Sequence, residues 1–538
     1  MRLLTRALVT VLAAATVAAG GPGSAVPRNP DARTIAHVLN RAGFGARAGD
    51  IERVRSIGLQ AYIDQQLYPE RIPDSALAAR LAALDTLNKS SRELADEYFE
   101  PAQRARQQAK LQADKDPSMN PSTDDAAKTR TPEVMAAQRK ARQVIENLSD
   151  QKILRASFSD RQLEEVMVDF WFNHFNVFAG KGMTQVYLTE YERDTIRPRV
   201  FGKFRDLLGA TAKSPAMLFY LDNWQSADPA AQDRMMDVGR RRRARFGFMA
   251  PPQIQNPQRP AGAAQGRPKR GLNENYGREL MELHTLGVDG GYTQDDVINV
   301  ARAFTGWTID VPRQGGGFRF EPRLHDPNEK VVLGHRIKAG GGQSDGEKVL
   351  DILAASPATA RFIATKLARR FVSDTPPPAL VDRAAKRFHD TDGDIREVVR
   401  TILTSPEFFA ADAYRAKVKT PFEFVVSAVR ASGAEVDEAT PLAQAVRQLG
   451  MPLYMCQPPT GYADRADAWV NTGALLNRMN FALQLVSNRM RGVRAGTSLA
   501  GDALAGDVSS TTAATIARAT DARQTAALTL GSPEFQRR

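Results

Sequence analysis

The chain has 538 residues, of which 42% are hydrophobic, and a formal net charge of +12, so it can form two or three domains or one large helical body. Its single cysteine, Cys456, excludes an internal disulfide. The sequence has no Walker A loop, dinucleotide-binding fingerprint, H-E-x-x-H motif or C-x-x-C pair, which argues against nucleotide-dependent enzymes, nicotinamide dehydrogenases and metalloproteases of the HExxH type.

Residues 1–25 have the pattern of a secretory signal peptide. Arg2 and Arg6 give a basic start, residues 7–19 are apolar, and small residues precede a cleavage site after Ala25. An uncleaved membrane anchor is the alternative, although this apolar run is short for a bilayer. The sequence therefore predicts export by a Sec-type signal to the periplasm or the extracellular space.

One large helical domain is predicted for residues 26–495. Two segments within it have the composition of loops: 110–135 is rich in proline and small polar residues, and 226–271 is a basic insertion. Residues 496–538 are rich in alanine, glycine and threonine, and we expect a low-complexity tail that ends in a short helix. The predicted fold class is mainly α, a large multi-helix body with a small antiparallel β-hairpin or sheet near residues 317–337.

The stretch from Asp160 to Phe178 predicts a strong helix. His174 lies in its apolar stripe, together with Phe170 and Trp171. A histidine in such a stripe is most often a core residue with a hydrogen-bond partner. The alternative is a general base or a ligand in a pocket lined by aromatic rings.

The basic insertion at 226–271 carries ten lysines and arginines, three aspartates and six prolines. We interpret it as a solvated and partly disordered segment, because it has little apolar periodicity. A functional alternative is contact with anionic lipid, lipopolysaccharide or acidic polysaccharide. Nucleic acid is not an expected partner, since the chain is predicted to be exported.

The densest group of functional-type polar residues lies between Asn273 and Trp307. A step of 100° per residue places Arg278, Glu279 and Glu282 on one face of the first helix predicted there. Crowded carboxylates raise one another's pKa values, so this face is a candidate for a site with a general acid or base. The alternative is a solvated surface held by pairs of side chains four residues apart.

The segment that follows is predicted to hold a second helix and the β structure. Thr293 and Asp296 have the spacing of a capping box, and the helix that they begin is expected to continue to about Trp307. Residues 317–337 alternate in character and contain β-branched side chains, which predicts a sheet of two or three short strands.

His325 and Asp326 are predicted to lie in a loop at the end of this sheet. Loops on rigid scaffolds often carry catalytic groups, which makes the pair an acid–base candidate by position. The alternative is that Asp326 and Pro327 begin a turn and that His325 is exposed. The sequence leaves both interpretations open.

Residues 456–469 predict an irregular loop. Pro458, Pro459 and Gly461 are typical of a rigid connection, and Tyr462 adds an aromatic ring. We expect such a loop to be suited to covering a pocket.

Several ordered blocks of sequence carry a family resemblance. They are HVLNRAGFG at His37–Gly45, DFWFNHF at Asp169–Phe175, LHDPNEKVVLG at Leu324–Gly334 and KTPFEFVVSAVRASG at Lys419–Gly433, together with the stretch Asn273–Trp307. Over roughly residues 33–485 the chain resembles the bacterial family known as domain of unknown function 1800. The resemblance implies a secreted, largely helical bacterial protein, often encoded beside a second uncharacterised family that is similar to sulfatases and alkaline phosphatases. The family name assigns no activity.

We therefore expect an exported bacterial protein with one polar pocket. It would act as a hydrolase-type enzyme, or as the partner of one, on an envelope or extracellular polymer. The candidate catalytic residues are Glu279, Glu282, His174, His325, Asp326 and Arg278. In this hypothesis Glu279 or Glu282 is the general acid or base, His174 and His325 are polarising groups, and Arg278 holds an anion.

The competing hypothesis is a non-catalytic secreted scaffold or binding protein that works with the sulfatase- or phosphatase-like partner. In that case the same residues form a buried structural network, and the basic insertion does the binding. The sequence predicts no cofactor-binding residue. It leaves the metal question open, because the six histidines are few and a metal site would have to assemble from distant elements.

Overall fold

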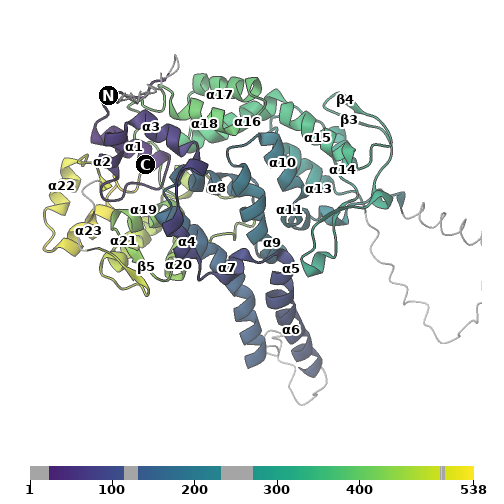
Figure 1. The fold of residues 1–538 in the computed structure, drawn as a ribbon, viewed down its shortest axis with the longest axis horizontal. Helices are drawn as coiled ribbons and strands as arrows, with labels where there is room; N and C mark the ends of the chain where they lie inside the picture. The colour runs from purple at the N-terminus through teal and green to yellow at the C-terminus, as the bar shows by residue number, and fades with distance from the viewer. Residues whose placement is uncertain (1–23, 114–130, 232–270, 497–498, 500–502) are drawn as a thin grey trace, which may run out of the picture.

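Helices make up most of the chain, and most are short enough to depend on burying an apolar face against their neighbours (Figure 1). The fold is therefore mainly α, as predicted. The computed structural model describes residues 24–113, 131–231, 271–496, 499 and 503–538. All but the last two residues of the predicted signal peptide, most of segment 110–135 and most of the basic insertion lie outside the described residues.

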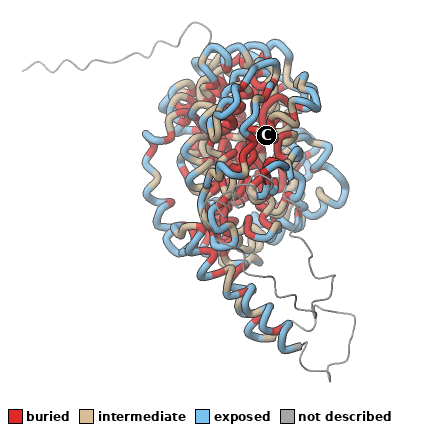
Figure 2. The backbone as a smooth tube through the Cα atoms, turned by 90° about the vertical axis from the view of Figure 1, so that its right-hand side faces the viewer, coloured by how far each residue is buried: buried red, intermediate tan, exposed pale blue. Residues whose placement is uncertain are grey.

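The part of the chain before the basic insertion contributes helices across the body and forms a projecting arm. In the arm, α6 packs against α7, and the two helices extend away from the body in Figures 1 and 2. The helices of this part are α1 (Ala32–Arg41), α2 (Asp50–Ile57), α3 (Leu59–Gln66), α4 (Ser75–Leu81), α5 (Ser91–Leu94), α6 (Glu100–Ala113), α7 (Pro132–Phe158), α8 (Gln162–His174), α9 (Thr184–Glu190), α10 (Phe204–Lys213) and α11 (Pro215–Tyr220).

The part after the insertion completes the body. In it α13 packs against α14, α17 against both α16 and α18, and α21 against α23. The helices are α13 (Glu274–Glu282), α14 (Gln294–Ala303), α15 (Ser344–Ala355), α16 (Pro357–Phe371), α17 (Pro378–Asp390), α18 (Ile395–Leu403), α19 (Pro421–Ala431), α20 (Thr440–Gln448), α21 (Thr472–Val486), α22 (Ser510–Ile516) and α23 (Ala522–Gly531).

The described residues contain three antiparallel sheets of two strands each. The predicted β structure near 317–337 corresponds to two of them, β1 (Trp307–Ile309) with β2 (Phe318–Phe320) and β3 (Lys330–Val332) with β4 (His335–Ile337). The third pairs β5 (Glu435–Val436) with β6 (Val493–Arg494), and the sequence analysis did not predict it.

Two predicted helices are shorter in the structure. The helix expected over residues 160–178 is α8, which covers Gln162–His174. The second helix of the polar stretch, α14, ends at Ala303, so its predicted extension to about residue 307 is wrong. Gly306 adopts a φ of 79°, a conformation that ends a helix, and Trp307 is the first residue of β1.

Helix α8 lies in the middle of the body and is buried along most of its length. Trp171 on this helix stacks with Phe175, with their ring centroids 5.9 Å apart. Burying a large aromatic side chain contributes roughly 2–3 kcal/mol to stability, so these rings fix the helix firmly. In its C-terminal half, Asp169, Phe170 and Asn173 stay partly exposed and mark one open side.

No helix in the described ranges combines the length and the apolar character that a bilayer crossing requires.

Candidate functional site

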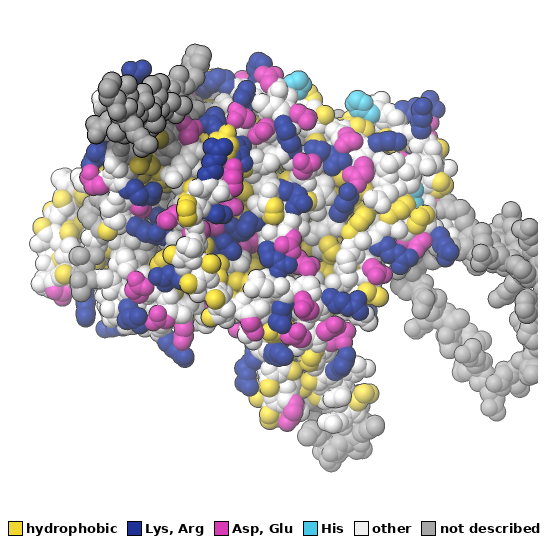
Figure 3. All heavy atoms as spheres, viewed as in Figure 1, with side chains coloured by type: hydrophobic (Ala, Val, Ile, Leu, Met, Phe, Trp, Pro, Cys, Tyr) yellow, Lys and Arg dark blue, Asp and Glu magenta, His cyan; other side chains and the backbone are white. Residues whose placement is uncertain are grey.

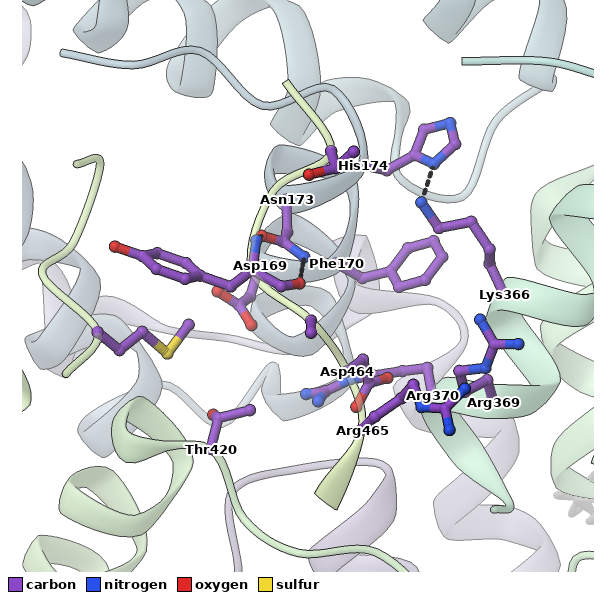
Figure 4. Close-up of a pocket in the computed structure, with 14 residues that line it drawn as sticks. Asp169, Phe170, Asn173, His174, Lys366, Arg369, Arg370, Thr420, Asp464 and Arg465 are labelled. Carbon is purple, nitrogen blue, oxygen red and sulfur yellow. Dashed lines mark hydrogen bonds between the residues drawn. The ribbon is translucent and has the colours of Figure 1, made fainter. Parts of the chain in front are cut away.

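A cavity of about 270 Å³ opens between α8, α16 and the loop that precedes α21 (Figure 4). Four lining residues come from the C-terminal half of α8 and three from α16, at spacings that place each group on one helix face. The full lining is Asp169, Phe170, Asn173, His174, Lys366, Arg369, Arg370, Thr420, Met451, Thr460, Tyr462, Ala463, Asp464 and Arg465.

His174 and Lys366 form a hydrogen-bonded pair in the cavity wall (Figure 4). His174 Nδ1 lies 2.9 Å from Lys366 Nζ, and His174 Nε2 lies 3.1 Å from the backbone oxygen of His284. Because a carbonyl oxygen can only accept, Nε2 carries the hydrogen and Nδ1 accepts an N–H of the lysine. The rings of Phe170 and Phe175 flank the imidazole, with centroids 6.4 and 4.5 Å from its own.

Burial decides which member of the pair carries a charge. Burial lowers the pKa of His174 well below its usual range, and the charge of Lys366 lowers that pKa further, so the imidazole is neutral. Burial also lowers the pKa of Lys366 to about 8, with a further contribution from the charge of Arg369. At pH 7 the lysine is therefore mostly protonated, with about a tenth of it present as the neutral amine.

The acidic side chains of the cavity are already bound to other lysines. Asp169 lies 2.7 Å from Lys152, and Asp464 lies 2.8 Å from Lys417. Lys366 itself has no carboxylate within 4.0 Å among the described residues. Its closest polar partner is the neutral imidazole of His174, and the charge of Asp464 offsets only part of the lowering of its pKa by burial and by Arg369.

The arginines of the cavity differ in how well they are paired. Arg370 is buried and forms an ion pair with Glu423. Arg369 Nε donates to a backbone oxygen at 3.2 Å, with no carboxylate within 4.0 Å among the described residues. Arg465 lies 3.6 Å from Asp467, and both side chains are more than half exposed, where an ion pair contributes little.

The loop that covers the cavity is fixed to α8. Asn173 Nδ2 donates to the backbone oxygen of Tyr462 at 2.8 Å, and the backbone N–H of Tyr462 donates to Asn173 Oδ1 at 2.7 Å. Gly461 permits this close approach, because its φ is 72° and a Cβ there would lie 2.3 Å from the backbone oxygen of Asn173. Residues 460 and 462–465 line the cavity, as expected of a rigid covering loop.

A family model described as "Protein of unknown function (DUF1800)" matches residues 37–537. The chain belongs to this family. The match confirms the resemblance seen in the sequence blocks and extends through α23. No curated protein and no solved structure matches the chain. Because the DUF1800 description names no activity, the function has to be inferred from the site.

The predicted acid–base helix of this DUF1800 protein, α13, does not line the cavity. Arg278 donates to the side chain of Gln294 at 2.8 Å, and Glu282 accepts from the hydroxyl of Tyr292 at 3.0 Å. Burial raises the pKa of Glu279, and the charge of Glu282 raises it further, in the direction expected from crowded carboxylates. These three residues therefore form a separate polar surface on α13 and α14.

His325 and Asp326 lie in a second separate place, a buried network at the end of the β3–β4 hairpin. His325 Nδ1 donates to a backbone oxygen at 2.9 Å, and its Nε2 lies 3.2 Å from Asp345. Lys330 Nζ donates to Asp345 at 2.8 Å, and Arg302 Nε donates to Asp326 at 2.7 Å. Among the six predicted residues, His174 alone lines the cavity.

The residues of the cavity offer little to a metal ion. In the described part of the chain, no three His, Cys, Asp or Glu side chains converge as metal ligands. The cavity contributes one histidine and two aspartates, and each aspartate is already bound to a lysine.

Proposed function

We propose that this DUF1800 protein is an exported hydrolase-type enzyme that acts on an envelope or extracellular polymer in the cavity between α8 and α16. The hydrogen-bonded pair of His174 and Lys366 is the observation that carries the proposal. A lysine whose pKa lies near neutrality, placed in a cavity beside a neutral histidine, is the kind of perturbed group that catalytic sites use. The export signal predicted for residues 1–25 supports a substrate outside the cytoplasm.

In this mechanism Lys366 is the general base. When the lysine is a neutral amine, it donates one N–H to His174 Nδ1 and has a lone pair left for a proton. A water molecule attacks the scissile centre, its oxygen forms the new bond, and its proton passes to Lys366 Nζ. The ammonium then returns that proton to the leaving oxygen as the old bond breaks, so the lysine ends as it began.

His174 is a positioning residue in this scheme. Its Nε2–H donates to the backbone oxygen of His284, which fixes the ring and leaves Nδ1 directed at the lysine. The predicted acid–base role of Glu279 and Glu282 passes to Lys366 in this proposal, because the glutamates lie outside the cavity.

Hydrolysis of acidic and neutral polymer fragments by the purified protein tests the proposal. We expect Lys366→Met to lower kcat by about 100-fold or more. With neutral fragments the wild-type rate should rise with pH through about 8, with acidic fragments the midpoint should lie higher, and His174→Gln should move the midpoint. Lys348→Met is the matched control, because Lys348 is exposed on α15 and outside the cavity. Hydrolysis that survives Lys366→Met unchanged would overturn the mechanism.

A second candidate function is a non-catalytic binding protein that works with the sulfatase- or phosphatase-like partner implied by the family resemblance. Two observations favour it: the buried, paired state of His325 and Asp326, and the tight fixation of the covering loop by Asn173. A screen without any hydrolysis, combined with ligand binding in the cavity, would select this function over the enzyme.

A further inference from the structure

We infer that the cavity binds an oxyanion group, a carboxylate, sulfate or phosphate ester, carried by one acidic unit of the polymer. The cationic triad of Lys366, Arg369 and Arg465 supplies the contacts. The identity of the polymer rests on the proposed function, whereas the binding of the anion does not require catalysis.

Two cations of the cavity wall lie side by side on α16. Lys366 and Arg369 lie three residues apart on α16 and therefore on one helix face. They are close enough that the charge of Arg369 lowers the pKa of Lys366. Two like charges side by side without a carboxylate destabilise the empty site, and an anion between them would remove that repulsion.

The third cation of the triad has only a weak ion pair in the described part of the chain. Arg465 comes from the covering loop, and its only ion pair in the described ranges is the long, exposed contact with Asp467. Such a pair is weak, so the guanidinium can exchange Asp467 for a ligand at little cost. Asp169 and Asp464 are each bound to another lysine at 2.8 Å or less, and the attraction of Asp464 offsets only part of the lowering of the Lys366 pKa.

The charged side chains on one face of the body are mixed in sign. On the face shown in Figure 3, basic and acidic side chains are mixed over the body and do not gather into a patch of one sign. A general attraction to polyanions would need such a patch, whereas three cations around one cavity favour a single anionic group.

The volume of the cavity limits the size of the group that it can hold. The volume of about 270 Å³ lies just below the roughly 300–1,000 Å³ of ordinary ligand pockets. It therefore suits one sugar-sized unit and not a long polymer segment. Phe170 and Tyr462 add flat apolar surfaces to the wall, against which the uncharged face of such a unit can pack.

Isothermal titration calorimetry of the purified protein tests the inference with three probes: glucuronate for a carboxylate, inorganic sulfate and inorganic phosphate. We expect at least one probe to bind, with affinity at least tenfold weaker in Lys366→Met and in Arg465→Gln. Arg361→Gln is the control, because Arg361 is on the same helix but 62% exposed and outside the cavity. The strongest probe identifies the class of anion.

The decisive readout is proton uptake. An anion raises the pKa of Lys366, so binding near pH 8.5 should take up a fraction of a proton from the buffer, measured in two buffers of different ionisation enthalpy. Lys366→Met should abolish the uptake. No binding, or binding unaffected by both variants, would overturn the inference. Hydrolysis without anion binding would refute only this inference, and anion binding without hydrolysis would refute only the enzyme.

Discussion

Replacing Lys366 by methionine should stabilise the protein at neutral pH. Methionine keeps the length and apolar character of the lysine side chain and removes the charge. In the folded protein the ammonium has no carboxylate within 4.0 Å among the described residues, and its hydrogen-bond partner is the neutral imidazole of His174. The charge therefore lowers stability, which is the opposite of the usual contribution of a lysine in an ion pair.

The magnitude follows from the pKa of Lys366, which burial lowers from 10.5 to about 8. At about 1.4 kcal/mol per pKa unit, the charged lysine lowers the free energy of unfolding by about 3 kcal/mol at pH 7. The substitution also removes the donor to His174 Nδ1, which costs about 1 kcal/mol. The net gain is therefore about 2 kcal/mol, or about 2 °C in Tm for a chain of this length.

The pH dependence of the free energy of unfolding gives the sign of this effect independently. Between pH 8 and 10.5 the unfolded chain binds more protons at this lysine than the folded chain does. Wild-type stability therefore rises through that window, whereas methionine does not titrate. The advantage of Lys366→Met should be complete below about pH 8 and lost by about pH 10.

Differential scanning calorimetry of both proteins at pH 7 and pH 10, in chloride buffers without sulfate, phosphate or carboxylates, measures the effect. Lys348→Met on the exposed surface of α15 controls for the loss of a surface lysine. A lower Tm for Lys366→Met at pH 7, or a difference from wild type that is the same at both pH values, would refute the reasoning.

Asp345→Asn should lower the free energy of unfolding by about 3–5 kcal/mol in urea, because it leaves the buried Lys330 ammonium without its carboxylate. Asn173→Ala removes both hydrogen bonds to Tyr462, so proteolysis should cut the covering loop faster, with a loss of about 1–3 kcal/mol. Asp150→Asn should stabilise the protein by about 1–3 kcal/mol above pH 6 and have no effect below about pH 4. Burial raises the pKa of Asp150 from 3.8 to about 6, so the folded protein is penalised once this acid ionises. An unchanged urea midpoint for Asp345→Asn, unaltered cleavage for Asn173→Ala, or a pH-independent gain for Asp150→Asn would contradict these expectations.

Local chemistry made the start of α14 predictable but not its end. Thr293 and Asp296 satisfy each other's backbone N–H groups, an arrangement that needs only residues three apart in the sequence. The end depends on Gly306 and on the pairing of Trp307 with Phe320 across β1 and β2. An apolar residue at helical spacing can continue a helix or begin a strand. Periodicity alone therefore predicted a helix that was too long.

The two members of the cavity pair also differ in whether residues close in the sequence reveal them. His174 could be recognised as a candidate, because a histidine within an apolar helix stripe is visible in a short window of sequence. Lys366 could not, because its partner lies 192 residues away and its own helix carries several other cations, such as Arg361 and Arg369. Only the packing of α16 against α8 shows which of these cations meets His174.

The dense polar stretch at α13 lies outside the cavity, and its side chains bond to those of α14. Arg278 and Glu274 both bond to Gln294, so their spacing serves the contact between α13 and α14. A crowd of polar residues that satisfy one another is what a stable surface or helix pair requires. A dense group of polar residues in one segment can therefore serve the contact between two helices as well as a binding site, and the sequence alone does not distinguish the two.

Compensation of charge is the more informative property. Lys330 and Lys366 both make hydrogen bonds of 2.8–2.9 Å, but Lys330 has the carboxylate of Asp345 and Lys366, in the cavity wall, has an imidazole. Breaking the first pair should destabilise the protein, and removing the second lysine should stabilise it. A cation without a carboxylate beside it lowers the stability of the fold. Mutation would readily remove such a cation unless the lysine has a function. Opposite signs for Asp345→Asn and Lys366→Met would therefore mark the first lysine as structural and the second as functional.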